Sequence, residues 1–224
     1  MIGETKENQQ IPVSEALLAV IASLLLSLFL AGFIAGLNYG LAMVVAELLL
    51  AVVPFGYMLS KKIDVKKYVR FELNPRNILL GVAVGSLLVY FDFLIVVALT
   101  SLFGPSKAVE ESNKRLAEMT HSVDGLIFVA ATLISAGICE EFAFRGFLQT
   151  AMSSKYPSWM ALIASAFAFG LLLHFDPQGV YIIAAFLIGL VLGLIYHLSR
   201  SYTVCATAHA TLNLIILVLT LLQR

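Results

Sequence analysis

The sequence has little of what holds small secreted domains or nucleic-acid-binding proteins together. It contains only two cysteines, Cys139 and Cys205, and both lie in apolar stretches where a free cysteine usually behaves as a small hydrophobic residue. A disulfide framework and a zinc-knuckle spacing are therefore excluded. Charged residues make up 12% of the chain and their formal sum is zero. Without a basic stripe interleaved with aromatic residues, nucleic acid is excluded as a partner.

Polar residues are also too scarce for a soluble globular protein, because 60% of the 224 residues are hydrophobic and the mean hydropathy is +0.95. Several apolar runs are long enough to cross about 30 Å of hydrocarbon. They lie near 16–37, 40–59, 78–103, 179–198 and 203–222, and two more that carry polar residues lie at 125–150 and 158–174. The sequence predicts an all-α polytopic transmembrane helix bundle of about seven spans, within a range of six to eight.

We expect a single membrane domain over residues 1–224. Within it, residues 1–124 form N-terminal spans without recognisable motifs, and residues 125–224 form the catalytic core helices. The first apolar run is too long for a signal-peptide core and its leader lacks net positive charge, so we interpret it as a retained span. The lipid bilayer is the expected surrounding, and the sequence does not determine an oligomeric state.

Basic residues are concentrated in the first long loop, 61–77, whereas the loop at 104–124 balances its charges. Cytoplasmic loops carry an excess of lysine and arginine, so the first loop is expected in the cytoplasm. Alternating spans then place the N-terminus and the turns around Lys155 and Arg200 in the cytoplasm, and Arg224 outside. Because the chain is short and lacks targeting extensions, we expect a multi-pass protein of a prokaryotic plasma membrane.

One apolar run contains two adjacent carboxylates and an arginine, in the segment Glu140-Glu141-Phe142-Ala143-Phe144-Arg145. A charged side chain at the centre of a bilayer costs roughly 3 kcal/mol or more, so such a cluster is either a structural ion pair or a functional site. On an α-helix Glu141 and Arg145 share a face and can pair, while Glu140 points about 100° away. We therefore predict Glu141 and Arg145 as structural support, and Glu140 as a general base or acid.

Other polar residues in the apolar runs extend this candidate site. His209 and Asn213 lie four residues apart and share one helix face, and His174 directly precedes a segment whose proline ends the helix. Glu47 and Asp92 lie in the second and third spans. Their simplest interpretation is a protonated or hydrogen-bonded helix contact, and the functional alternatives are water access to the site or a proton relay.

These motifs resemble those of the CAAX prenyl protease type 2 and bacteriocin-processing (Abi, or CPBP) family of intramembrane endopeptidases. The family pattern is Glu-Glu-x-x-x-Arg, then a phenylalanine and histidine motif, then His-x-x-x-Asn. The first and third motifs are intact at 140–145 and 209–213. The middle motif usually reads Phe-x-x-x-His, but this chain has Gly170 at that spacing from His174 and Phe169 one residue earlier. The resemblance covers roughly residues 125–213.

The resemblance implies hydrolysis of a peptide bond within the membrane, in a peptide or lipidated protein substrate that includes prenylated CAAX-type proteins. It implies that Glu140 and His174 activate a water, and His209 with Asn213 can donate hydrogen bonds to the oxyanion. No serine or cysteine nucleophile lies in the motifs, and neither Gly-x-Ser-x-Gly nor His-Glu-x-x-His occurs. No cofactor is expected.

Two alternatives remain open on the residues alone. Two histidines and a glutamate are also the ligand set of some catalytic zinc sites, so a zinc-dependent version of the same protease is one alternative. The other is a non-catalytic membrane scaffold or a proton-coupled carrier that uses Glu47, Asp92 and the histidines. The absence of an internal repeat counts against the carrier.

The depths of the motifs predict where the site opens. His209 lies about 12 Å past the Arg200 turn, whereas Glu140 lies more than about 20 Å from the Lys155 turn, at 1.5 Å per residue. These two residues meet only if the turns lie at different levels. We therefore expect the polar hairpin 145–158 to project into the cytoplasm, with an active site that opens to the cytoplasm about 10 Å below the membrane surface.

Overall fold

The computed structural model describes residues 10–174 and 176–222, and in this part of the chain all regular secondary structure is helical. Six segments are long and apolar enough to cross a membrane. They are α1 (Val13–Ala35), α2 (Tyr39–Ser60), α4 (Pro75–Phe103), the continuous segment Val123–Ser153, α9 (Val180–Ser199) and α10 (Tyr202–Leu222). The apolar helix α8 (Ser158–Leu173) is shorter. The predicted all-α membrane bundle of six to eight spans is confirmed, and the protein is a multi-pass membrane protein.

The segment Val123–Ser153 consists of three consecutive parts, α6 (Val123–Glu141), η2 (Phe142–Gln149) and α7 (Thr150–Ser153). Two further helices, α3 (Val65–Tyr68) and α5 (Lys107–Met119), lie in the loops between spans. Two of the spans, α2 and α4, begin where an asparagine supplies a side-chain cap. The side chain of Asn38 accepts from the backbone of Leu41, and that of Asn74 accepts from Asn77, directly before a proline in the first turn.

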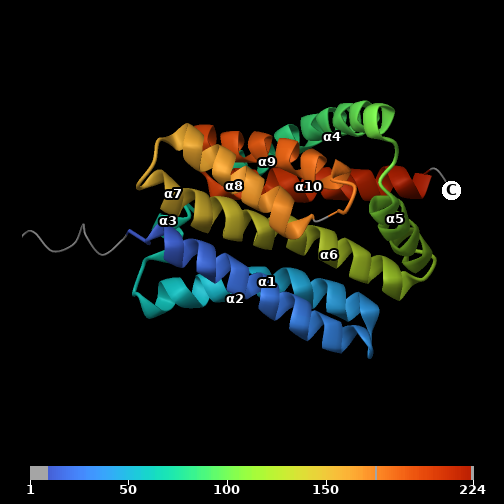
Figure 1. The fold of residues 1–224 in the computed structure, drawn as a ribbon, viewed down its shortest axis with the longest axis horizontal. Coiled ribbons are helices and arrows are strands. Elements are labelled where there is room, and N and C mark those ends of the chain that lie inside the picture. Colours follow the sequence, from blue (N-terminus) through green and yellow to red (C-terminus); the bar gives the residue numbers. More distant parts are fainter. Residues whose placement is uncertain (1–9, 175, 223–224) are drawn as a thin grey trace, which may run out of the picture.

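Helix α6 lies in the interior of the bundle, with α2 packed along it on one side and α10 on another (Figure 1). Helix α10 also packs against α4, α8 packs against α9, and α1 packs against α2. Gly137 allows the close approach of α6 and α10, because a Cβ atom at this position would lie 2.5 Å from the backbone nitrogen of Ala210. The Glu-Glu-x-x-x-Arg motif thus lies at the end of a central helix and faces several others.

The two ends of the bundle differ in charge, as the sequence predicted. The start of α1, the basic loop with α3, the turn after α7 and the turn between α9 and α10 lie at one end, whereas α5 and the end of α10 lie at the other (Figure 1). The first end carries Lys61, Lys62, Lys66, Lys67, Arg70, Arg76, Lys155 and Arg200. Arg224 lies outside the described residues. The assignment of the basic end to the cytoplasm stays a prediction.

Candidate active site

The helix that carries the two glutamates changes its winding directly after them. Residues Phe142–Gln149 form a π-helix, in which the wider turn leaves backbone groups without their usual partners, and all eight side chains are buried. Side chains complete the bonding, since the hydroxyl of Ser165 donates to the carbonyl of Phe144 at 2.8 Å and that of Thr150 donates to Arg145 at 3.2 Å. The spacing of Glu141 and Arg145 predicts a regular α-helix here, but the segment is a π-helix, a winding that often marks functional sites.

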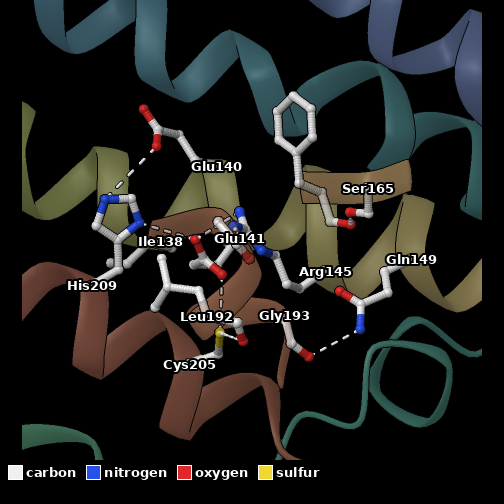
Figure 2. A network of polar contacts seen from close by, with 12 residues as sticks. Ile138, Glu140, Glu141, Arg145, Gln149, Ser165, Leu192, Gly193, Cys205 and His209 are labelled. Atoms are coloured by element: carbon white, nitrogen blue, oxygen red, sulfur yellow. Dashed lines mark hydrogen bonds and ion pairs between the residues drawn. The ribbon is translucent and has the colours of Figure 1, made fainter. Parts of the chain in front are cut away.

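The polar residues of this π-helix are directed into the protein. The side chain of Arg145 donates to the carbonyl of Gly189 on α9 at 3.1 Å. That of Gln149 donates to the carbonyl of Gly193, also on α9, at 3.0 Å (Figure 2). Arg145 is 0% exposed and Gln149 is 2% exposed. Both side chains thus face α9, and the prediction that the hairpin 145–158 projects beyond the membrane into the cytoplasm stays a prediction. The polarity of these two residues is explained by carbonyl partners on α9.

Glu141 is bound on both of its carboxylate oxygens and is fully buried. Its Oε1 lies 3.0 Å from Nη1 of Arg145 and 2.9 Å from Nδ1 of His209. Its Oε2 accepts from the thiol of Cys205 at 2.9 Å. The predicted pair of Glu141 and Arg145 is confirmed, and it persists although the helix winding changes between the two residues. Glu141 also orients His209, a role that the sequence analysis did not assign.

Glu140 has the opposite surroundings. It is 5% exposed, and its Oε2 is buried without a hydrogen-bond partner within the described residues. The nearest cationic group is Nε2 of His209, at 3.8 Å, so His209 lies between the two glutamates with one ring nitrogen toward each (Figure 2). Glu140 is thus free of a local partner, as the helix geometry predicted, and it is brought together with His209 from α10.

His174 ends α8, where its backbone nitrogen donates to the carbonyl of Gly170 at 3.2 Å. Its ring lies between two aromatic rings, with centroid distances of 4.8 Å to Phe169 and 4.9 Å to Tyr181. Its Nε2 is buried, and the described part of the chain offers it no hydrogen-bond partner. None of the hydrogen bonds and ion pairs within residues 10–174 and 176–222 joins His174 to Glu140.

Phe169 lies one residue before Gly170, which occupies the position where the middle motif usually has phenylalanine. Its ring contacts His174, lies 6.2 Å from the ring of His209, and packs under the guanidinium of Arg145 at 4.3 Å. A side chain at Gly170 has no room, because its Cβ would lie 2.8 Å from the carbonyl oxygen of Ile182. The displaced phenylalanine therefore packs against the site, while the glycine lets α8 and α9 approach closely.

The loop after His174 is fixed by an acidic cap. The carboxylate of Asp176 accepts from the backbone nitrogens of Gln178 at 3.1 Å and Tyr181 at 3.2 Å, at the start of α9. Burial raises the pKa of Asp176, but these backbone hydrogen bonds outweigh that effect and lower its pKa from the usual value. The cap therefore holds Tyr181 in place beside the ring of His174.

Asn213 lies one helical turn beyond His209 on the same side of α10. Its amide donates to the carbonyl of Leu133 on α6 at 3.1 Å. The structure therefore turns Asn213 toward α6, as it does His209, but the amide is engaged by the backbone. One of the two hydrogens of an asparagine amide remains for a second acceptor.

Two neighbours of the site were missed by the sequence analysis. Cys205 was interpreted as apolar filler, although its spacing of four residues from His209 places it on the same helix face. Tyr181 carries no motif signal, since only the turn between α8 and α9 brings it to His174. Within residues 10–174 and 176–222, no three His, Cys, Asp or Glu side chains are grouped to hold one metal ion. The geometry of the described residues therefore does not add support to the zinc-dependent alternative.

Comparisons with known proteins give three findings. The chain is 30% identical over 188 residues to a protein of Mycoplasma capricolum subsp. capricolum that is described as uncharacterized, with 78% of this chain aligned. The chain spans about half, 53%, of the length of that relative. No solved structure matches the chain. Residues 122–215, which carry all three motifs, match the model of the family described as Type II CAAX prenyl endopeptidase Rce1-like.

Proposed function

We propose that the protein is an intramembrane glutamate-type endopeptidase that hydrolyses a peptide bond of a membrane-associated peptide or lipidated protein. The observation that carries the proposal is the contrast between Glu140 and its neighbour. Glu140 presents a buried carboxylate oxygen without a hydrogen bond, 3.8 Å from a histidine that Glu141 orients. The family match over residues 122–215 supports the same reaction class.

In the proposed reaction Glu140 takes a proton from a water molecule, and the hydroxide attacks the carbonyl carbon of the scissile peptide bond. His174, whose buried Nε2 has no hydrogen-bond partner among the described residues, shares in holding that water. The proton on Glu140 then passes to the leaving amine as the carbon–nitrogen bond breaks. The site returns to its starting state with the carboxylate free, and no covalent acyl-enzyme forms.

The oxyanion is assigned to α10. Because Nδ1 of His209 faces the Glu141 carboxylate, that nitrogen carries a hydrogen, and a protonated ring carries a second hydrogen on Nε2. His209 and the remaining amide hydrogen of Asn213 then donate to the developing negative charge. Donors of this kind lower the barrier by roughly 3 kcal/mol each in a site that excludes water.

The site is proposed to open toward the basic end of the bundle and thus to the cytoplasm, in a prokaryotic plasma membrane. His209 lies about 10 Å from the start of α10, counted at 1.5 Å per residue, and α10 begins at the basic end. A substrate segment needs to enter only two helical turns from that surface. No cofactor takes part in the proposed reaction.

The test uses the purified protein in proteoliposomes with a farnesylated peptide that ends in a CAAX sequence, read by mass spectrometry. We expect Glu140→Gln to lower the cleavage rate by roughly 10²- to 10⁴-fold, because it removes a general base. The matched control is Glu110→Gln on α5, far from the site, which should cleave at the wild-type rate. Wild-type cleavage by Glu140→Gln rules out the proposed base. Stoichiometric zinc together with loss of activity on chelation replaces it with the zinc-dependent alternative.

A further inference from the structure

The loop between α2 and α4 carries cations that the protein itself does not neutralise. Two of its lysines are paired, Lys61 with Glu15 and Lys67 with Asp64. In the part of the chain that the structure describes, no ion pair engages its other four cations, which are Lys62, Lys66, Arg70 and Arg76. All four side chains are exposed, and Glu72 is the one carboxylate of the described loop that is also left unpaired. These four residues are called the basic patch below.

The basic patch lies where the lipid-facing surface of the bundle ends. Leu59 and Leu79 flank the loop on α2 and α4, Leu73 lies within it, and each of these side chains is more than half exposed. In a multi-pass membrane protein such side chains contact the acyl chains of the lipids. At the same end of the bundle, Tyr156 and Trp159 are exposed around the start of α8 (Figure 1). Tyrosine and tryptophan are enriched at the height of the headgroups, so the basic patch lies at that height.

The backbone of this loop is bonded to the bundle, which gives the basic patch a fixed shape. The backbone nitrogen of Tyr202 donates to the carbonyl of Arg70 at 3.1 Å, and the hydroxyl of Tyr196 donates to the carbonyl of Val69 at 3.3 Å. Lys62 and Arg70 both adopt the left-handed backbone conformation, with φ of 55° and 58°, which residues other than glycine adopt only where the surroundings impose it. A surface that is ordered before binding loses less entropy when a ligand binds.

We propose that the basic patch binds the phosphate groups of anionic phospholipids. Lysine and arginine donate charge-assisted hydrogen bonds to phosphate oxygens, and clusters of four or more such residues next to a span attract anionic lipids. The height of the patch brings its cations to these phosphates, and the exposed leucines beside it contact the acyl chains. The binding does not depend on the proposed peptidase activity. It anchors in the headgroup layer the end of the bundle toward which the active site is proposed to open.

The experiment titrates the purified protein in detergent with phosphatidylglycerol or phosphatidylcholine and measures the Kd of each lipid by native mass spectrometry. We expect the double variant Lys62→Gln/Lys66→Gln to bind phosphatidylglycerol roughly 25-fold more weakly than the wild type, because each cation near an anionic headgroup contributes about fivefold. The matched control is Lys107→Gln/Lys114→Gln, which removes two exposed lysines at the other end of the bundle. Its Kd should stay within about twofold of the wild type. Equal Kd values of the wild type for the two lipids overturn the proposal, and so does an equal loss in both double variants.

Two further measurements use the wild type alone and so do not depend on the folding of a variant. Because a ligand that binds the folded state stabilises it, phosphatidylglycerol should raise the unfolding temperature more than phosphatidylcholine does. Inorganic phosphate at the same concentration lacks acyl chains and should not raise it, and an equal rise overturns the assignment to a lipid. The preference for phosphatidylglycerol should disappear at about 1 M salt, where charges are screened within about 3 Å. A preference that persists at this salt concentration contradicts recognition by the charges of the basic patch.

Discussion

The Glu141 side and the Glu140 side of α6 meet the bundle in different ways. On the first side, Arg145, His209 and Cys205 bind both carboxylate oxygens of Glu141. On the second side, Oε2 of Glu140 is buried, and the described residues offer it no hydrogen bond. The same holds for Oε2 of Glu47 on α2 and for Nε2 of His174 at the end of α8. Adjacent residues of one helix thus have opposite surroundings.

This difference suggests that one set of residues stabilises the fold and the other carries out the reaction. A buried polar atom without a partner costs about 1–3 kcal/mol, so the Glu140 side is a region where folding loses free energy. A paired and hydrogen-bonded cluster such as that of Glu141 avoids this cost but leaves no group free to react. We therefore assign the structural role to the satisfied side and the reaction to the unsatisfied side.

Changing each glutamate to glutamine tests this assignment and is expected to give the largest effect. Glu141→Gln leaves Arg145 buried without its counter-charge and should lower the free energy of unfolding by about 3–5 kcal/mol. Glu140→Gln removes a charge that lacks such a partner and should change that free energy by less than about 1 kcal/mol. Thermal unfolding of the purified proteins in one detergent measures both.

Arg145→Met supplies the control for the first variant, because it removes the opposite member of the same pair. It should destabilise the protein to a similar extent, and the double variant should be less destabilised than the sum of the two single ones. Equal stability losses in Glu140→Gln and Glu141→Gln contradict the division between the two sides.

A smaller effect is expected at the contact between Gly137 on α6 and Ala210 on α10, the helix that carries His209. A Cβ atom at Gly137 meets the backbone of Ala210, which cannot move without moving the helix. We expect Gly137→Ala to lower the free energy of unfolding by about 1–3 kcal/mol and to lower activity, because His209 shifts relative to Glu140. Gly56→Ala on α2 is the control. Nothing lies within 4 Å of a Cβ there, so alanine should stabilise the helix by roughly 0.5–1 kcal/mol.

Most of the fold follows from patterns that lie within single segments. Apolar runs fixed the spans, and the charge of the loop 61–77 predicted which turns share an end. The pairing of Glu141 with Arg145 also follows from a spacing of four residues. Each of these signals depends only on residues that are close in sequence, which is why they can be read without the structure.

The rest depends on contacts between distant segments. The engagement of Asn213 by Leu133 and the position of Tyr181 beside His174 arise only when the helices pack. The burial of Gln149 follows from a carbonyl on α9, which no pattern in 145–158 could reveal. Side-chain polarity alone predicted water there, although the protein itself supplies the partner.

The smallest expected effect compares the two cysteines, one on each side. The thiol of Cys205 donates to Glu141 at 2.9 Å, whereas the thiol of Cys139, beside Glu140, makes no hydrogen bond with the described residues. Cys205→Ala should lower the free energy of unfolding by about 1 kcal/mol, and Cys139→Ala by less.

The comparison is sharpest in the background of Glu141→Gln, measured by thermal unfolding. If the thiol of Cys205 acts through the charge of Glu141, Cys205→Ala costs less once that charge is removed, because interacting residues are not additive. Cys139→Ala should cost the same in both backgrounds, since its contacts do not include Glu141. An equal cost of Cys205→Ala in the two backgrounds means that the thiol acts only by packing, and Arg145 and His209 alone then account for the stability of the Glu141 side.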